Sequence, residues 1–148
     1  MKRIIFTLLL ILHSFTSFCQ EIIHERIEDE NLPFAIIEEI PVFPGCEEIE
    51  RKERMNCFQN QIINHIKTNF NYPKEALNKN IQGRVNVEFI INKEGEIEHI
   101  FSRGPSGTSI LEKEATRIIS LLPKMKPGTQ KGKPVNVRYV VPISFKLH

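Results

Sequence analysis

The sequence has little net charge, few cysteines and no metal-binding pattern. Its 148 residues carry 20 basic and 18 acidic side chains, for a formal charge of +2, whereas a protein that coats nucleic acid would be strongly basic. Three cysteines are an odd number, which does not suit a protein built on disulfides. None of the five histidines stands at zinc-ligand spacing to another histidine or to a cysteine pair. We predict one globular domain without a bound metal.

The sequence also lacks a recognisable catalytic constellation. Gly104-Pro-Ser-Gly107 precedes a predicted helix, but the lysine that a nucleotide-binding loop requires does not follow it. The acidic residues beside Cys46 lie in a charged loop and suggest no acid–base pair. A basic loop over 124–133 is interpreted as solvated surface, with attraction of an acidic ligand or a membrane head group as the alternative. We predict no catalysis, no cofactor, no small-molecule substrate and no nucleic-acid partner.

The longest apolar run lies at the start of the chain. Two basic residues precede nine apolar or threonine residues over 4–12, and small residues stand three and one positions before Gln20. This layout is typical of a signal peptide, residues 1–19, which is cleaved after Cys19. A transmembrane helix needs about 20 apolar residues, and stretching the run to 4–18 gives fifteen. Retention of 4–18 as an inner-membrane anchor and lipidation of Cys19 are the alternatives.

Cleavage would change the net charge and the number of cysteines. The remaining chain would be neutral, with 18 basic and 18 acidic residues, and would keep only Cys46 and Cys57. Export to an oxidising compartment favours a disulfide between these two cysteines. Closing their short loop would stabilise the fold by about 3 kcal/mol in the chain-entropy model. Two free thiols are the alternative.

Charge and composition divide the exported chain into two regions. Residues 20–60 carry 11 acidic and 4 basic residues, whereas 61–148 carry 7 acidic and 14 basic residues. We interpret 20–57 as an acidic leader and 58–148 as the folded domain. Within the leader, the apolar run Phe34–Ile37 predicts a short strand.

Periodicity predicts an α+β domain after the leader. Apolar residues recur every four positions from Phe58 to Phe70, which predicts a helix, and a short helix is expected after Pro73. Alternation over 84–91 predicts a strand, followed by a turn at 92–95 and a returning strand. The offset of three between Ile97 and Ile100 predicts a bulge at Glu98–His99.

A second helix and a long strand complete the prediction. Ser109 and Glu112 are spaced as a capping box, and an apolar stripe follows as far as Pro123. Apolar residues alternate from Val135 to Phe145, the longest strand pattern in the chain. A strand at the edge of a sheet has unpaired backbone groups that can capture another strand, although Pro142 removes one donor there. Helices on one face of a small antiparallel sheet are expected.

Short motifs run through the domain in a fixed order. They are Tyr72-Pro73-Lys-Glu-Ala76-Leu77, Ile81-Gln-Gly83-Arg84-Val85-Asn-Val87, Gly95-Glu-Ile97, Leu111-Glu-Lys-Glu114-Ala115, Lys126-Pro127-Gly128, Gly132-Lys133-Pro134-Val135 and Pro142-Ile143-Ser-Phe145. Together, over about residues 58–147, the chain resembles the carboxyl-terminal domain of TonB proteins. The stretch from Pro41 to Glu47 is similar to a leader of periplasmic variants of this family.

The resemblance implies a fold, a place and a partner. It implies a three-stranded antiparallel sheet backed by two or three helices, in the periplasm of a Gram-negative bacterium. Family members bind a segment of outer-membrane receptors, the TonB box, as a strand beside the last strand of the domain. Carried over to this sequence, the partner-binding residues are Phe70, Asn71, Val135, Asn136, Val137, Arg138, Tyr139, Val140 and Val141.

Three functional hypotheses follow from this resemblance. The first is a soluble periplasmic domain that binds TonB-dependent outer-membrane receptors by strand addition. The second is an energy transducer that keeps residues 4–18 as its anchor. Against it, an energy transducer has a long proline-rich spacer, whereas the forty or so residues before this domain have prolines only at 33, 41 and 44. The third is a structural periplasmic module in which the last strand pairs with its copy in a homodimer.

Overall fold

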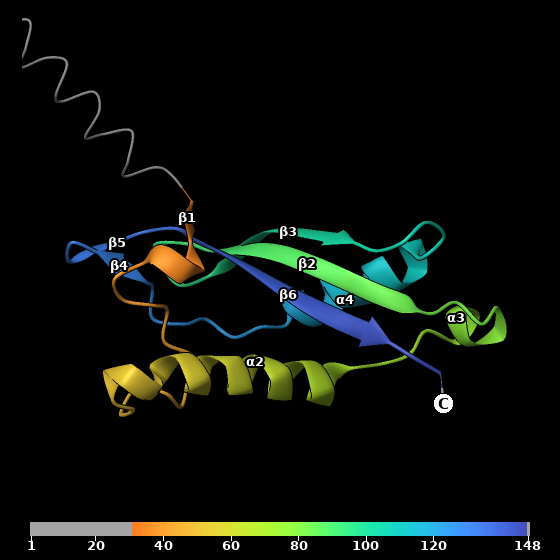
Figure 1. Ribbon diagram of the computed structural model, residues 1–148, viewed down its shortest axis with the longest axis horizontal. Coiled ribbons are helices and arrows are strands. Elements are labelled where there is room, and N and C mark those ends of the chain that lie inside the picture. Colours follow the sequence, from red (N-terminus) through yellow and green to blue (C-terminus); the bar gives the residue numbers. More distant parts are fainter. Residues whose placement is uncertain (1–30, 148) are drawn as a thin grey trace, which may run out of the picture. The chain divides into compact units, whose positions relative to one another are not determined.

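The computed structural model, which describes residues 31–147, is built around three long strands and three helices (Figure 1). The predicted signal peptide and leader residues 20–30 lie outside the described residues. The long strands are β2 (Gly83–Ile91), β3 (Ile97–Arg103) and β6 (Val137–Phe145), and the helices are α2 (Arg54–Asn69), α3 (Lys74–Asn78) and α4 (Ser109–Ser120). The short elements are β1 (Leu32–Pro33), β4 (Thr129–Gln130), β5 (Lys133–Pro134) and the 3-10 helices η1 (Phe34–Ile36) and η2 (Arg51–Glu53).

The main sheet has the strand order β1-β6-β2-β3. β2 pairs antiparallel with both β6 and β3, which confirms the expected three-stranded antiparallel sheet. β1 adds two residues to the outer side of β6 in the parallel direction, and β4 and β5 form a separate small hairpin. The pairing of β2 with β3 shifts register between Glu88 and Ile90. His99 has a φ of 50° there, so the predicted bulge at Glu98–His99 is confirmed.

The core lies between one face of this sheet and the helices. Alternate residues of β2, from Val85 to Ile91, are fully buried, whereas Arg84 and Asn86 on the other face are exposed. α4 contacts β2 and β3 through its apolar stripe, and α2 contacts α4. The predicted stripe residues of α4 are all buried: Leu111, Ala115, Ile118, Ile119 and Leu122.

Leader residues from Asn31 onward belong to the same compact unit as the domain. Phe34, Ile37 and Phe43 are buried in the common core. The leader backbone lies against the basic loop, where Glu39 pairs with Thr129 and Val42 pairs with Lys126. Part of the loop that we interpreted as solvated is therefore a docking surface for the leader.

Gly128 explains why a Lys126-Pro127-Gly128 motif occurs in this loop. A Cβ atom at residue 128 would lie 2.7 Å from Ile37 Cδ1 and 2.8 Å from Val137 Cγ2. Glycine therefore allows both the leader and the beginning of β6 to lie close to the backbone of residue 128.

The predicted strand at Phe34–Ile37 is wrong. The strand is Leu32–Pro33, and the apolar run that follows it forms η1. Pro33 is extended, with a φ of −61° and a ψ of 135°, after which the chain turns inward. The turn brings the Phe34 ring between Phe58 and Tyr139, each with a centroid distance of 4.8 Å. Burial of this ring outweighs continued pairing along β6.

The predicted capping box of α4 is also wrong. The residue before the helix is Thr108, and no side chain caps the first turn. The Thr108 hydroxyl donates to the carbonyl of Pro105, and Glu112 accepts the N–H of Gly104 over 2.7 Å. The acidic side chain therefore fixes the preceding loop instead of reaching back to Ser109.

The disulfide between Cys46 and Cys57 is present and joins the leader to α2. We expect replacement of both cysteines by alanine to lower the free energy of unfolding by about 3 kcal/mol, because the unfolded chain regains the freedom of the open loop. Urea unfolding followed by circular dichroism measures this loss. Reductant should cause a similar loss in the unmodified protein and none in the double variant. An unmodified protein that is indifferent to reductant would contradict the prediction.

Candidate functional site: an open strand edge beside an apolar groove

β6 presents backbone groups on the side that faces away from β2. The N–H of Leu32 donates to the carbonyl of Asn136 over 2.9 Å, so the backbone groups of Asn136 point away from β2. The ladder between β2 and β6 continues from Val137 to Phe145 without a shift. Alternate residues of an antiparallel strand point the same way, so residues 138, 140, 142 and 144 also face outward.

Pro142 fits this alternation because its missing N–H faces the outer edge. Its partner across the ladder is Asn86, and the neighbouring pairs Val85–Ile143 and Val87–Val141 supply the hydrogen bonds to β2. Proline is tolerated in a strand where the absent donor points away from the ladder. The weakening expected at Pro142 therefore falls on the open edge, and the internal ladder is intact.

Part of this outer edge is already occupied within the described residues. Leu32 lies opposite Val137, and Pro33 lies opposite Arg138. Among residues 31–147, no strand pairs with the outer edge after this point. The backbone groups left open are the N–H and C=O of Val140, the C=O of Pro142, and the N–H and C=O of Ser144.

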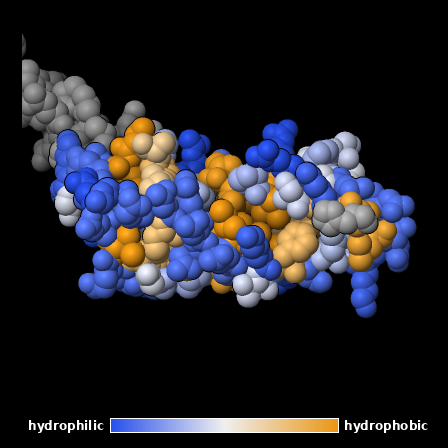
Figure 2. Space-filling model, turned by 60° about the horizontal axis from the view of Figure 1, so that its bottom comes forward, coloured by the Kyte–Doolittle hydropathy of each residue, from blue (hydrophilic) through white to orange (hydrophobic). Residues whose placement is uncertain are grey.

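An apolar groove of about 600 Å³ runs along the open edge, between β6 and α2. Its α2 wall is formed by Gln59, Ile62, Ile63, Ile66 and Lys67, with Phe70 just beyond the helix, and its β6 wall by Tyr139, Val141, Pro142, Ile143 and Ser144. Ile63 is 46% exposed and Phe70 is 37% exposed, so apolar surface is available to a partner. Figure 2 shows apolar surface in the middle of this side of the molecule, beside hydrophilic side chains.

Aromatic clusters lie at the two ends of the groove. At one end Tyr139 packs on Phe58 and Phe34, with ring centroids 5.2 and 4.8 Å away. At the other end Phe70 packs on Phe145 and Tyr72, with ring centroids 5.1 and 6.3 Å away. α2 and β6 therefore run in the same direction along the groove, and a rigid cluster joins them at each end.

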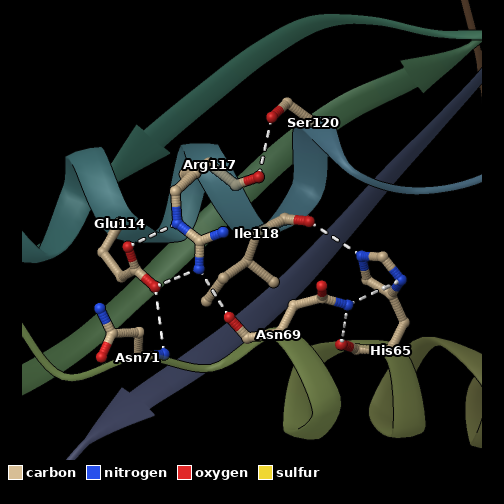
Figure 3. A network of polar contacts seen from close by, with 7 residues as sticks. All are labelled: His65, Asn69, Asn71, Glu114, Arg117, Ile118 and Ser120. Carbon is tan, nitrogen blue, oxygen red and sulfur yellow. Dashed lines mark hydrogen bonds and ion pairs between the residues drawn. The ribbon is translucent and has the colours of Figure 1, made fainter.

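A polar network from α4 holds the segment around Phe70 (Figure 3). Glu114, which is 8% exposed, accepts the N–H of Asn71 over 3.1 Å. The same carboxylate binds the guanidinium of Arg117 through two nitrogens, at 2.8 and 2.6 Å. Arg117 also donates to the carbonyl of Asn69 over 2.6 Å. The backbone on both sides of Phe70 is therefore fixed, and the ring is held at the end of the groove.

His65 links α2 to α4 in the same region (Figure 3). Its Nε2 donates to the carbonyl of Ile118 over 2.9 Å, because a carbonyl can only accept. The side-chain amide of Asn69 donates to the carbonyl of His65 over 2.8 Å. This histidine has a structural role, as expected from the absence of a metal-ligand pattern.

The predicted contact residues occupy different positions along the strand and groove. Tyr139, Val141 and Phe70 line the groove, and the backbone of Val140 faces the open edge. Val137 and Arg138 lie beside β1, and the side chain of Asn136 accepts the N–H of Lys93. Val135 and Asn71 are engaged through their own N–H groups, which donate to Gly128 and Glu114. The contacts with a partner stay a prediction.

Sequence reasoning missed the α2 wall and the last part of the edge. Ile63, Ile66 and Lys67 line the groove, as do Pro142, Ile143 and Ser144. Ile63 is an apolar residue beyond the stripe that the core requires, but one such isoleucine on a helix does not by itself indicate a binding wall. The shift toward residue 144 could not be read from periodicity, since it results from the pairing of β1 with the beginning of β6.

Residues 31–147 contain no group of three or more histidine, cysteine or acidic side chains that could hold a metal ion. No helix within that range is both long and apolar enough to cross a membrane.

The fold and the edge define a class of protein: an α+β domain with an antiparallel sheet, helices on one face and an accessible strand edge. A protein-family model described as Gram-negative bacterial TonB protein C-terminal matches residues 68–147. This match spans more than half of the chain, and the chain belongs to this family. The resemblance inferred from the short motifs is thereby confirmed.

A solved structure also resembles this chain. The NMR solution structure of Helicobacter pylori TonB-CTD shares 26% sequence identity, and the comparison covers 69% of this chain and 87% of that chain with a TM-score of 0.47. No curated protein matches the chain.

The Glu114 network predicts a local effect around Phe70. We expect Glu114→Ala to lower the free energy of unfolding by about 1–3 kcal/mol, because the N–H of Asn71 and the guanidinium of Arg117 lose their acceptor. Amide exchange at Asn71 should accelerate by about tenfold or more. Glu75→Ala is the control, because Glu75 forms an exposed pair with Lys79 and should leave both measurements unchanged. Unaltered exchange at Asn71 in Glu114→Ala would refute the network's role.

The burial of Tyr139 predicts that the free energy of unfolding decreases at alkaline pH. Burial raises the pKa of Tyr139 above its ordinary value of 10.0. The unfolded chain therefore loses this proton first as pH rises, so the stabilisation is fully present below about pH 10 and is lost as pH rises through the raised pKa. The free energy of unfolding, measured by urea between pH 8 and 11, should fall less steeply in Tyr139→Phe. Identical slopes would contradict the assignment.

Proposed function

We propose that this protein is a non-catalytic component of the cell envelope that binds extended segments of outer-membrane receptors as an added strand. The observation that carries the proposal is the open edge of β6 from Val140 to Ser144, with an apolar groove beside it. A segment paired to this edge would continue the sheet, and its alternate side chains would face α2. Backbone pairing would give affinity, and the groove would give side-chain preference.

The energetics of the site fit a weak and reversible interaction. Five backbone groups are open between Val140 and Ser144, and each net hydrogen bond contributes about 0.5–1.5 kcal/mol. Each apolar side chain that is buried against Ile63, Ile66 or Phe70 adds about 1.5–3 kcal/mol. Association costs at least about 4 kcal/mol in lost translational and rotational freedom, and this cost offsets much of the free energy gained from the hydrogen bonds and the apolar contacts. Such an interaction would hold a receptor segment transiently and would still allow its release.

Family membership supports the partner class and the location. TonB C-terminal domains in general interact with outer-membrane receptors and are typically periplasmic or envelope-associated. The Cys46–Cys57 disulfide is consistent with an oxidising compartment. The signal peptide over residues 1–19 belongs to this proposal, with an inner-membrane anchor over 4–18 as its alternative. Membrane fractionation and intact-mass analysis of the exported protein distinguish the two.

The same edge could also accept a second copy of the chain, but Pro142 works against the symmetric arrangement. In an antiparallel dimer centred on Pro142, two carbonyls would face each other with no N–H between them. A foreign segment can place its own N–H opposite the carbonyl of Pro142. Analytical ultracentrifugation tests the homodimer, which a strict monomer at high concentration would rule out.

The proposed function is tested by titration with receptor segments. Amino-terminal segments of the host's outer-membrane receptors, added to ¹⁵N-labelled protein, should shift the amides of Val140, Ser144 and residues 59–70 of the α2 wall. Shifts that are confined to other surfaces would refute this interface.

A substitution in the groove should weaken binding without unfolding the protein. We expect Ile63→Asp to raise the dissociation constant for the receptor segment by about tenfold or more, because a carboxylate in the apolar groove must lose water when the segment binds. Leu121→Asp is the matched control, because Leu121 is 50% exposed and lies at the end of α4, outside the groove. Titration calorimetry measures both affinities, and equal affinities would contradict the prediction.

A further inference from the structure

The leader and the proposed partner share the outer edge of β6. β1 covers this edge at Val137 and Arg138, and the open part begins directly afterwards. β1 consists of Leu32 and Pro33 only, because the chain turns into η1 at Phe34. The division between the covered edge and the open edge is therefore set by the turn at Phe34.

Phe34 is firmly placed at this division. Its side chain is 8% exposed and belongs to the main hydrophobic core. The ring lies 4.8 Å from the rings of both Phe58 and Tyr139. Tyr139 is the first β6 residue that lines the groove. β1 thus ends beside the end of the groove, and the chain turns into the core there.

The leader behind Phe34 is attached at several independent points. Glu39 and Thr129 exchange two backbone hydrogen bonds, at 3.1 and 2.9 Å, and Val42 and Lys126 exchange two more, both at 3.0 Å. Within the leader, Glu39 also binds the guanidinium groups of Arg51 and Arg54. The Cys46–Cys57 disulfide then joins the leader covalently to α2. These attachments keep Phe34 close to its site.

We propose that the leader is a fixed boundary of the binding edge, so that a partner strand pairs with Val140–Ser144 and not with Asn136–Arg138. This inference rests on the proposed function and adds to it the register of the bound segment. A partner that displaced β1 would only replace the backbone pairing that Leu32 and Pro33 already supply, and it would expose the Phe34 ring. The open edge and the groove beside it can be used without that loss.

The boundary also makes the leader a determinant of specificity. A segment longer than the open edge would meet the Phe34 turn and would have to leave the sheet there. The end of β1 would therefore fix which side chains of the bound segment enter the groove between Tyr139 and Ser144. The folded domain without its leader would offer a longer edge and a less defined register.

The inference is tested by amide hydrogen exchange on the protein expressed from its complete reading frame. Two probes are used, a receptor amino-terminal segment and a generic eight-residue peptide of alternating threonine and valine. On binding of either probe we expect exchange at Val140 and Ser144 to slow by about tenfold or more. Exchange at Leu32, whose N–H donates to Asn136, should stay unchanged.

Two variants and a control show whether the leader sets the register. Leu32→Pro removes the donor that pairs with Asn136 and keeps the Phe34 ring, whereas Phe34→Ala removes the ring that ends β1. In both we expect the protection caused by the probe to extend to Arg138. Ile36→Ala is the matched control, because Ile36 lies in the same turn and is 68% exposed. It should behave as the unmodified protein does.

The possible outcomes separate the boundary from the proposed function. Faster exchange at Leu32 on binding would show that the leader is displaced, and would overturn the boundary while leaving receptor binding intact. Protection by the generic peptide alone, with Leu32 unchanged, would support the boundary and count against receptor segments as the partner. Failure of both probes to protect Val140 and Ser144 would overturn both proposals.

Discussion

The pairing of β2 with β6 is the constraint on which the rest of the structure depends. Nine consecutive residue pairs join the two strands without a shift. This register decides which residues of β6 face the helices and which backbone groups face outward. A slip by one residue would turn the missing N–H of Pro142 toward β2, expose Tyr139 and Val141, and remove the groove. The buried core and the open edge therefore both depend on the register between β2 and β6.

Much of the fold could be predicted because its signals are local. The alternation from Val135 to Phe145 and the four-residue spacing after Phe58 each report a face that the core requires. The bulge at Glu98–His99 was readable because it breaks such an alternation. Phe34 gave no such signal, because its ring contacts Tyr139, more than a hundred residues away. The order of short motifs identified the family, but it could not show where the edge of β6 becomes open.

The predicted receiving edge and the edge that the structure leaves open differ in position. Sequence reasoning placed the receiving edge at 135–141, whereas the groove and the open backbone groups lie from Tyr139 to Ser144. The displacement arises from the leader, whose docking depends on close approach at Gly128 and on burial of Phe34. The α2 wall was overlooked because an exposed isoleucine such as Ile63 is common on helices and becomes informative only when a strand edge lies beside it.

The contact between Phe34 and Tyr139 also has a consequence for the order of folding. The leader is synthesised before every other described element, yet β1 can pair only after β6, at the other end of the chain, is in place. Contacts of such high sequence separation form late because the loop-closure entropy of the intervening chain must be overcome first. Until then the whole outer edge of β6 is bare and prone to pairing with other chains. Docking of the leader thus shortens the bare part of this edge in each newly folded molecule.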